Sequence, residues 1–188
     1  ELLSLPHYQF LKINTDFRFY QPVSKTTTLT FRLNTGLAHG FGPWKVLPYD
    51  KYFFIGGINS IRAWAPRRLG PGSYKQTDAD GNLTYRFEQP GEILLESSLE
   101  WRQKIIGFVN WAFFVDAGNV FSSYCTPEQE AQNNCSNFDV GELRYSAGIS
   151  VSWLSGAFGI MSFSLAKPFN TTEIDETEVF QFTLGNTF

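Results

Sequence analysis

The fold is decided by the stretch Phe53-Phe54-Ile55-Gly56-Gly57-Ile58-Asn59-Ser60-Ile61-Arg62-Ala63-Trp64, which continues to residue 74. Paired glycines, two prolines and three arginines lie among aromatic residues there, a mixture that breaks regular strands. The stretch also carries too much apolar surface for a loop in free solvent. We therefore expect it to fill a pocket, and we expect the rest of the chain to build that pocket as the polar-lined interior of a β-barrel in which Arg62 is anchored.

Composition narrows the class of protein. The 188 residues correspond to one domain, and the net charge of -3 argues against a nucleic-acid-binding surface. Aromatic residues make up 17% of the chain, a bias typical of β-structure and of membrane-interface belts. No 18-residue apolar run occurs, so any membrane crossing is expected to use strands. The N-terminus lacks the features of an intact secretory signal, and we expect the sequence to begin within a longer protein.

Seven segments alternate apolar and polar residues with a period of two, which predicts β-strands with two different faces. In the first segment, Leu11, Ile13 and Phe17 alternate with Lys12 and Asp16. The segments lie at about residues 8–20, 29–37, 91–102, 109–117, 143–154, 161–166 and 180–188. On average they have about ten residues, the length of a tilted transmembrane strand. No helical period is found.

The lengths of the connections distinguish two kinds of barrel. Three connections are short, near Pro22, Lys104 and Gly156, and three are long, at about residues 40–90, 121–142 and 167–178. This asymmetry is typical of outer-membrane barrels. The alternative is a soluble lipocalin-like barrel or sandwich, which would turn the apolar faces inward and cover its outside with the charged residues of the polar faces. We favour an all-β antiparallel transmembrane barrel because of the loop asymmetry.

Cys125 and Cys135 lie in one polar stretch of the second long connection. Two cysteines that close a short loop fit a disulfide in an oxidising compartment, and two free thiols are the alternative. No metal site and no cofactor are expected, because only His7 and His39 could join the cysteines and neither shows ligand spacing.

Several local patterns resemble one family. The glycine-led segment 56–64 resembles the V/I-R-G-F/Y loop of the BamA/TamA superfamily of outer-membrane barrel-assembly proteins, also called bacterial surface antigens. Residues 114–121 resemble its F-x-D-x-G-x-V-W strand, and residues 143–169 resemble its R-x-S-x-G-x-x-x-x-W-x-S-P-x-G-P strand pair. The end of the chain resembles a β-signal, with alternate aromatic or apolar positions at Phe180, Phe182, Leu184, Gly185 and Phe188.

The resemblance implies that residues 1–188 are the C-terminal part of a sixteen-stranded outer-membrane barrel domain, with a lumen-inserted loop at about residues 41–90. The earlier strands and the periplasmic POTRA repeats would then belong to the rest of a longer protein. Ala63 and Pro66 depart from the motif, since Ala63 stands where the family has glycine. The R-A-W-x-P-R-x-L-G-P-G-S form is most similar to the TamA-like lipoprotein branch of Bacteroidota.

The resemblance also implies a site. Arg62, with Gly56, Gly57 and Trp64, would anchor the loop in the lumen, and its partners would be Glu100, Phe114 and Asp116. The alternation of apolar and polar residues independently favours the same partners, because all three lie on the polar faces of their strands. A guanidinium can bind a carboxylate bidentately and lie against an aromatic ring. The alternative is a solvated Arg62 in a wet lumen. Arg67 and Arg68 are expected to be solvated or to face phosphate.

The function implied is that of a bacterial outer-membrane protein assembly or insertion factor, which acts through a lateral gate beside the C-terminal strand. The implied partners are the outer-membrane lipid bilayer, unfolded outer-membrane protein or lipoprotein clients and accessory assembly subunits, with no nucleic acid. A polypeptide-secretion pore of the same superfamily and a passive porin are the alternatives. An enzyme is not expected, since the chain has no G-x-S-x-G elbow and its histidines lack acid partners at recognisable spacing.

Overall fold

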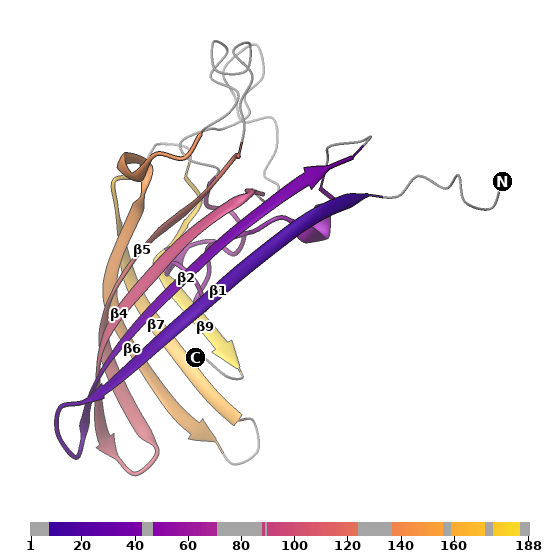
Figure 1. Cartoon of the computed structure of the whole chain (residues 1–188). Helices are drawn as coiled ribbons and strands as arrows, with labels where there is room; N and C mark the ends of the chain where they lie inside the picture. The colour runs from indigo at the N-terminus through magenta and orange to yellow at the C-terminus, as the bar shows by residue number, and fades with distance from the viewer. Residues whose placement is uncertain are drawn as a thin grey trace.

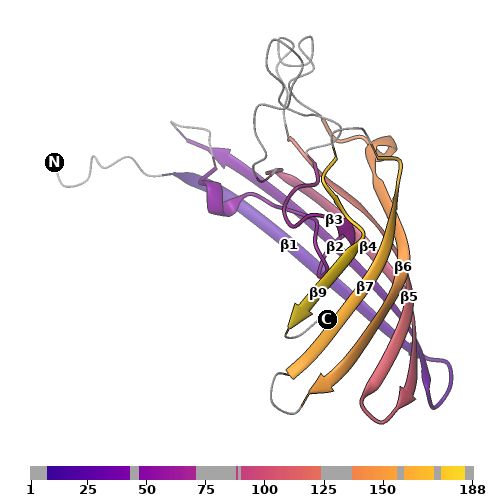
Figure 2. The same cartoon turned by 180° about the vertical axis from the view of Figure 1, so that it is seen from behind.

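The computed structural model describes residues 8–42, 47–70, 88, 90–123, 137–155, 159–171 and 175–184. Within this part of the chain, seven strands form one antiparallel sheet in the order β1-β2-β4-β5-β6-β7-β9. Their bounds are β1 Gln9–Pro22, β2 Thr27–Phe41, β4 Ile93–Ile106, β5 Val109–Phe121, β6 Arg144–Ser155, β7 Gly159–Phe169 and β9 Phe180–Leu184. The sheet curves into a trough, with its strands tilted as in part of a barrel wall (Figures 1 and 2). The prediction of about seven antiparallel strands is confirmed.

The connections alternate in length as predicted. Residues 23–26 join β1 to β2, residues 107–108 join β4 to β5, and residues 156–158 join β6 to β7. The turns at residues 23–26 and 107–108 lie together at the lower end of the sheet in Figure 1. The 3-10 helices Tyr49–Lys51 and Val140–Glu142 belong to the long connections.

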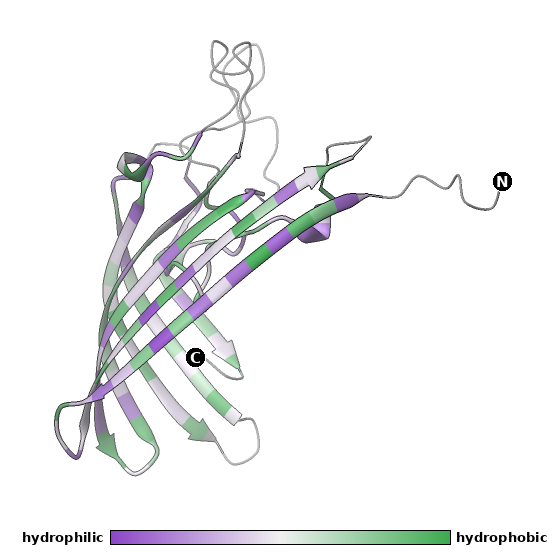
Figure 3. Cartoon of the chain, viewed as in Figure 1, coloured by the Kyte–Doolittle hydropathy of each residue, from purple (hydrophilic) through white to green (hydrophobic). Residues whose placement is uncertain are grey.

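The two faces of the sheet differ as the alternation predicts. On the convex face, the side chains of Leu11, Ile13 and Phe17 are more than half exposed. On the concave face, Glu96 and Asp116 are buried. Figure 3 shows the resulting alternation of hydrophobic and hydrophilic residues along the strands. Because the apolar face points outward, the lipocalin-like alternative is wrong, and the convex face has the character of a lipid-facing surface.

Among the described residues there is no helix long and apolar enough to cross a membrane.

Residues 53–70, called the lumen loop below, lie against the concave face of the sheet (Figure 2). Ile55, Ile61, Trp64 and Leu69 are almost completely buried there and belong to the apolar core. Two short strands complete the fold: β3, Ala63–Trp64, within the loop, pairs antiparallel with β8, Thr177–Glu178, which leads into β9. The core therefore lies between the loop and the sheet, on the inside of the curve.

Candidate functional site

The lumen loop turns back on itself at its paired glycines. Gly56 and Gly57 have φ angles of 107° and 91°, in the left-handed region that favours glycine. A Cβ atom on Gly56 would lie 2.3 Å from the carbonyl oxygen of Ala65, so no other residue fits without a shift of the backbone. The amide of Gly57 donates a hydrogen bond of 2.9 Å to the carbonyl of Trp64. These contacts close the loop and leave Arg62 at its tip.

The structure brings Arg62 together with the three residues that the family motif suggested as partners. Its Nε and Nη2 donate to the two carboxylate oxygens of Asp116 at 2.7 and 2.6 Å, and its Nη1 lies 2.6 Å from Oε1 of Glu100. The guanidinium carbon lies 3.4 Å from the ring centroid of Phe114. Only 3% of the Arg62 side chain is exposed. The arrangement combines a bidentate ion pair with a cation–π contact, which lysine could not reproduce.

Two further residues of the concave face take part in this cluster. Ser98 donates to Oδ1 of Asp116 at 2.6 Å and accepts a bond of 3.1 Å from Nη2 of Arg62. Arg102 binds the second oxygen of Glu100 at 2.6 Å. Sequence reasoning placed Ser98 and Arg102 on the polar face of their strand but did not single them out. Their spacing from Glu100 could have identified them, because residues two positions apart in a strand lie on the same face.

The cluster is balanced in charge, with two guanidinium groups and two carboxylates. Removing one partner of a buried ion pair typically costs about 3–5 kcal/mol, because the other charge stays buried and unpaired. Both carboxylates are occupied by guanidinium groups. The arrangement is therefore suited to anchoring the loop. In the described part of the chain no group of three or more His, Cys, Asp and Glu residues is placed to hold a metal ion.

A second ionic network fixes the loop from the neighbouring strands. Arg32 of β2 binds Glu96 at 3.0 Å and Asp16 at 3.1 Å, and it donates to the backbone carbonyl of Asn59 in the loop at 3.1 Å. Asn34 donates to the other oxygen of Glu96 at 3.2 Å. The loop is thus bound to β2 through Arg32 and to β4 and β5 through Arg62.

Trp64 connects the loop to the last strand. Its side chain is completely buried, and its carbonyl accepts a hydrogen bond of 2.8 Å from Nε2 of Gln181 on β9. The adjacent amide of Ala65 donates to the carbonyl of Glu176 at 3.0 Å. With the pairing of β3 and β8, these bonds make the lumen loop and the approach to β9 one structural unit. Gln181 occupies an inward-facing position in the alternation of its strand, but nothing in the sequence distinguished it from other such positions.

Ala63 departs from the family motif in a way that the structure makes visible. Its φ angle is 76°, a left-handed conformation that is costly for a residue with a Cβ atom. The glycine of the motif would adopt this conformation freely. The loop therefore makes a left-handed turn at Ala63 at the expense of local strain.

Arg67 and Arg68 were expected to be solvated or to face phosphate; Arg67 is solvated, and both also lie beside carboxylates. Arg67 binds Glu88 at 3.1 Å with its side chain 57% exposed, and Arg68 lies 3.6 Å from Glu176. The hydroxyl of Tyr49 donates to Glu88 at 2.8 Å. This hydrogen bond and that from Arg67 hold the pKa of Glu88 below its ordinary value.

The β-signal positions Phe180, Phe182 and Leu184 point to the convex face and are largely exposed. Phe163 of β7 packs against both phenylalanines, with centroid separations of 5.8 and 4.6 Å. The remaining positions of the predicted sites, Gly185, Phe188 and the proposed Cys125–Cys135 pair, lie outside the described residues.

Comparison with known proteins gives a consistent relationship. The Omp85 superfamily domain matches residues 6–188. The outer membrane protein assembly factor BamA of Neisseria meningitidis serogroup B is 30% identical over 194 residues, which cover 96% of this chain and 24% of that protein. The crystal structure of BamA from Haemophilus ducreyi lacking POTRA domains 1-3 superimposes with a TM-score of 0.74 at 28% identity, over 93% of this chain and 34% of that one. The chain thus spans about a quarter of the length of the relative and a third of the solved structure.

Proposed function

This chain belongs to the Omp85 superfamily, whose members in the comparison are bacterial outer-membrane proteins, and from that membership we propose that it forms the gate-bearing part of an assembly factor for outer-membrane proteins. The clients would be unfolded outer-membrane proteins or lipoproteins. The relative from Neisseria meningitidis is itself described as an assembly factor, which supports this choice within the superfamily.

The observation that carries the proposal is the short pairing between the C-terminal strand β9 and its neighbour β7, called the β7–β9 seam below. Among the described residues, which end at 184, β9 pairs with β7 over five register positions, 161–165 with 180–184, whereas β6 pairs with β7 over eleven and β1 with β2 over fourteen. The carbonyl of Val179 still accepts a hydrogen bond from the amide of Ala166 on β7, whereas residues 177 and 178 pair with the lumen loop instead. A strand held by few ladder hydrogen bonds can shift more easily than its neighbours and can expose an edge to a new strand. This is the property that a lateral gate needs.

The convex face beside this seam is suited to a lipid boundary. Trp153, Phe163 and Phe182 stack there, with centroid separations of 5.3 and 4.6 Å. The outward positions of the sheet also include Trp101, Trp111 and Phe180. A short apolar band next to the gate would thin the bilayer and lower the barrier to insertion of a client strand. Assembly would draw on the free energy of client folding.

Depletion of the full-length protein tests the function. We expect the levels of folded outer-membrane proteins to fall, and complementation with the intact gene should restore them. Unchanged levels after depletion would reject the proposal. Loss of one secreted polypeptide with normal outer-membrane protein levels would favour the secretion-pore alternative.

Movement of β9 can be tested with a disulfide. Phe163 and Phe182 are register partners, so the pair Phe163→Cys and Phe182→Cys can fasten β9 to β7. Val151 and Phe163 are partners across the longer seam, and Val151→Cys with Phe163→Cys is the matched control. We expect the first pair to slow assembly until a reductant is added and the second to have little effect. Equal effects of the two pairs would contradict a moving β9.

A further inference from the structure

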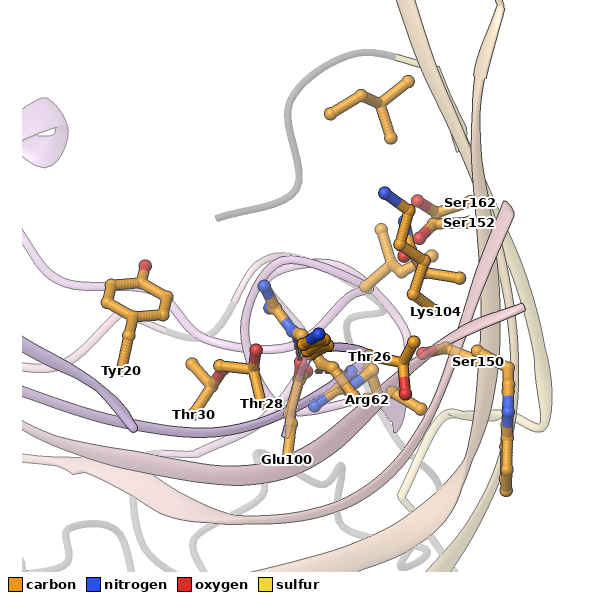
Figure 4. A pocket seen from close by; sticks show the side chains of 17 residues that line it. Tyr20, Thr26, Thr28, Thr30, Arg62, Glu100, Lys104, Ser150, Ser152 and Ser162 are labelled. Carbon is orange, nitrogen blue, oxygen red and sulfur yellow. Dashed lines mark hydrogen bonds and ion pairs between the residues drawn. The ribbon is translucent and has the colours of Figure 1, made fainter. Parts of the chain in front are cut away.

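A cavity of about 450 Å³ lies on the concave face between the tip of the lumen loop and the short-turn end of the sheet. Figure 4 shows Arg62 and Glu100 in the middle of its lining, Thr28 and Thr30 of β2 to one side, and Ser150 of β6 to the other. None of the anchoring contacts of Arg62 fills this space. Anchoring of the loop therefore does not account for the presence of this cavity.

The charges of the lining do not cancel. Four cationic side chains and one carboxylate border the cavity: Lys25, Arg62, Arg102, Lys104 and Glu100. Arg62 is bound by Asp116, and Glu100 lies between Arg62 and Arg102, so these guanidinium groups and carboxylates balance. Lys25 and Lys104 have no ion-pair partner among the described residues. Two positive charges are left over.

The two lysines are held at the same rim. Lys25 lies in the turn between β1 and β2, and the next residue, Thr26, accepts a backbone hydrogen bond of 2.7 Å from the amide of Lys104. The side chain of Gln103 also donates to the hydroxyl of Thr26 at 3.1 Å. These bonds fasten the turn to the end of β4. The backbone at both lysines is therefore held at this rim of the cavity.

The remaining lining is rich in hydroxyl groups. Threonine and serine hydroxyls from β2, β6 and β7 line the cavity, and that of Thr30 is buried without a partner in the described structure. Hydroxyl and ammonium groups together are suited to oxyanions, which accept several hydrogen bonds. A carboxylate or a phosphate satisfies this chemistry equally well.

The position of the cavity favours a polypeptide over a lipid. It lies on the concave face, whereas the neighbouring Leu29 points to the exposed apolar face. In outer-membrane barrels the short turns lie on the periplasmic side. A chain that enters from that side meets Lys25 and Lys104 first.

We propose that this cavity binds the carboxylate side chains of an acidic polypeptide segment that enters the barrel from the short-turn end. The inference rests on the proposed function, because it assigns a chemical property to the polypeptides that the barrel receives. It can still fail by itself, since binding to purified protein is measured separately from assembly in cells.

The test uses the full-length protein in detergent micelles and two short labelled peptides with blocked ends. One peptide alternates glutamate with serine, and the other has glutamine in place of glutamate. We expect the glutamate peptide to bind about tenfold more tightly at low ionic strength and to lose this advantage at high salt, because solvated ion pairs are modest and screened. Equal binding of the two peptides would overturn the proposal.

Variants locate the binding. Lys25→Gln with Lys104→Gln should remove most of the preference for the glutamate peptide. Lys51→Gln with Lys167→Gln is the matched control, since it makes the same change in charge outside the cavity. A photo-crosslinking residue at position 28 should capture the glutamate peptide, and one at position 29, on the opposite face, should not. An unchanged preference in the first double variant, or crosslinking from position 29 alone, would overturn the proposal.

Competition with phosphate tests whether the cavity binds phosphate groups instead of carboxylates. We expect inorganic phosphate and vesicles containing phosphatidylglycerol to compete weakly with the glutamate peptide. If either binds through Lys25 and Lys104 while the peptide does not, the site serves phosphate groups and the proposal of an acidic polypeptide is wrong.

Discussion

Arg62 holds Asp116 through two parallel hydrogen bonds of 2.7 and 2.6 Å, although the two residues are 54 positions apart in the chain. Both side chains are buried, with 3% and 0% exposed. The pair joins the tip of the lumen loop to the middle of β5. It is therefore the contact at which the loop is most sensitive to a change of charge.

Replacing Asp116 by Asn should test this anchor. The substitution preserves the shape but leaves Arg62 with one carboxylate, and we expect a loss of about 3–5 kcal/mol if the lumen is dry and less if it is wet. The measurement is the melting temperature of the barrel, followed by its heat-dependent mobility in gels. Asp50→Asn, which removes an exposed carboxylate paired with Lys51, is the control and should have almost no effect. Equal stability of both variants would mean that the loop is not held by this ion pair.

Ala63→Gly should stabilise the protein. The φ angle of 76° is costly for alanine and free for glycine, so we expect a gain of about 1 kcal/mol despite the greater freedom of glycine in the unfolded chain. Ala65 has no positive φ, and Ala65→Gly should instead destabilise by about 0.5–1 kcal/mol. The two melting temperatures should move in opposite directions. A decrease for both variants would show that Ala63 is not strained.

Gln181→Ala should loosen the last strand without unfolding the barrel. The side chain supplies the hydrogen bond between β9 and the carbonyl of Trp64. That carbonyl would keep its bond from the amide of Gly57, so we expect a cost of about 0.5–1.5 kcal/mol. Hydrogen exchange should become faster in residues 177–184 and stay unchanged in β4 and β5. Thr183→Ala, on the same face of β9, is the control. Uniformly faster exchange across the sheet would indicate general destabilisation instead of a local link.

Acid should weaken the contact between Glu88 and the lumen loop. The Tyr49 hydroxyl and Arg67 lower the pKa of Glu88 from its ordinary value of 4.5, so the charged form is favoured in the folded state. The stabilisation is present above pH 4.5 and is lost as the pH falls through the lower folded-state value. Melting curves from neutral to acid pH should show a steeper acid-side decrease for the native protein than for Glu88→Gln. Identical pH profiles would mean that this carboxylate is not coupled to folding.

The strands were predictable because a sheet that separates lipid from a polar lumen imposes a period of two on its sequence. The alternation of Leu11 and Lys12 is visible without knowledge of any neighbour. The same reasoning placed Glu100, Phe114 and Asp116 on the inner face. It could not select Gln181 or Ser98 among the many inward polar residues, since every second position qualifies.

By itself, the sequence determined the seven strands of the large sheet, their two faces and the alternation of short turns with long connections. These features depend on local periodicity and on the spacing of turn residues. Only the tertiary structure decided that Ala63 adopts a left-handed turn, that β3 pairs with β8 and that Lys25 and Lys104 share one cavity. Such contacts join segments far apart in the chain, and the curvature and register of the whole sheet set the distances between them.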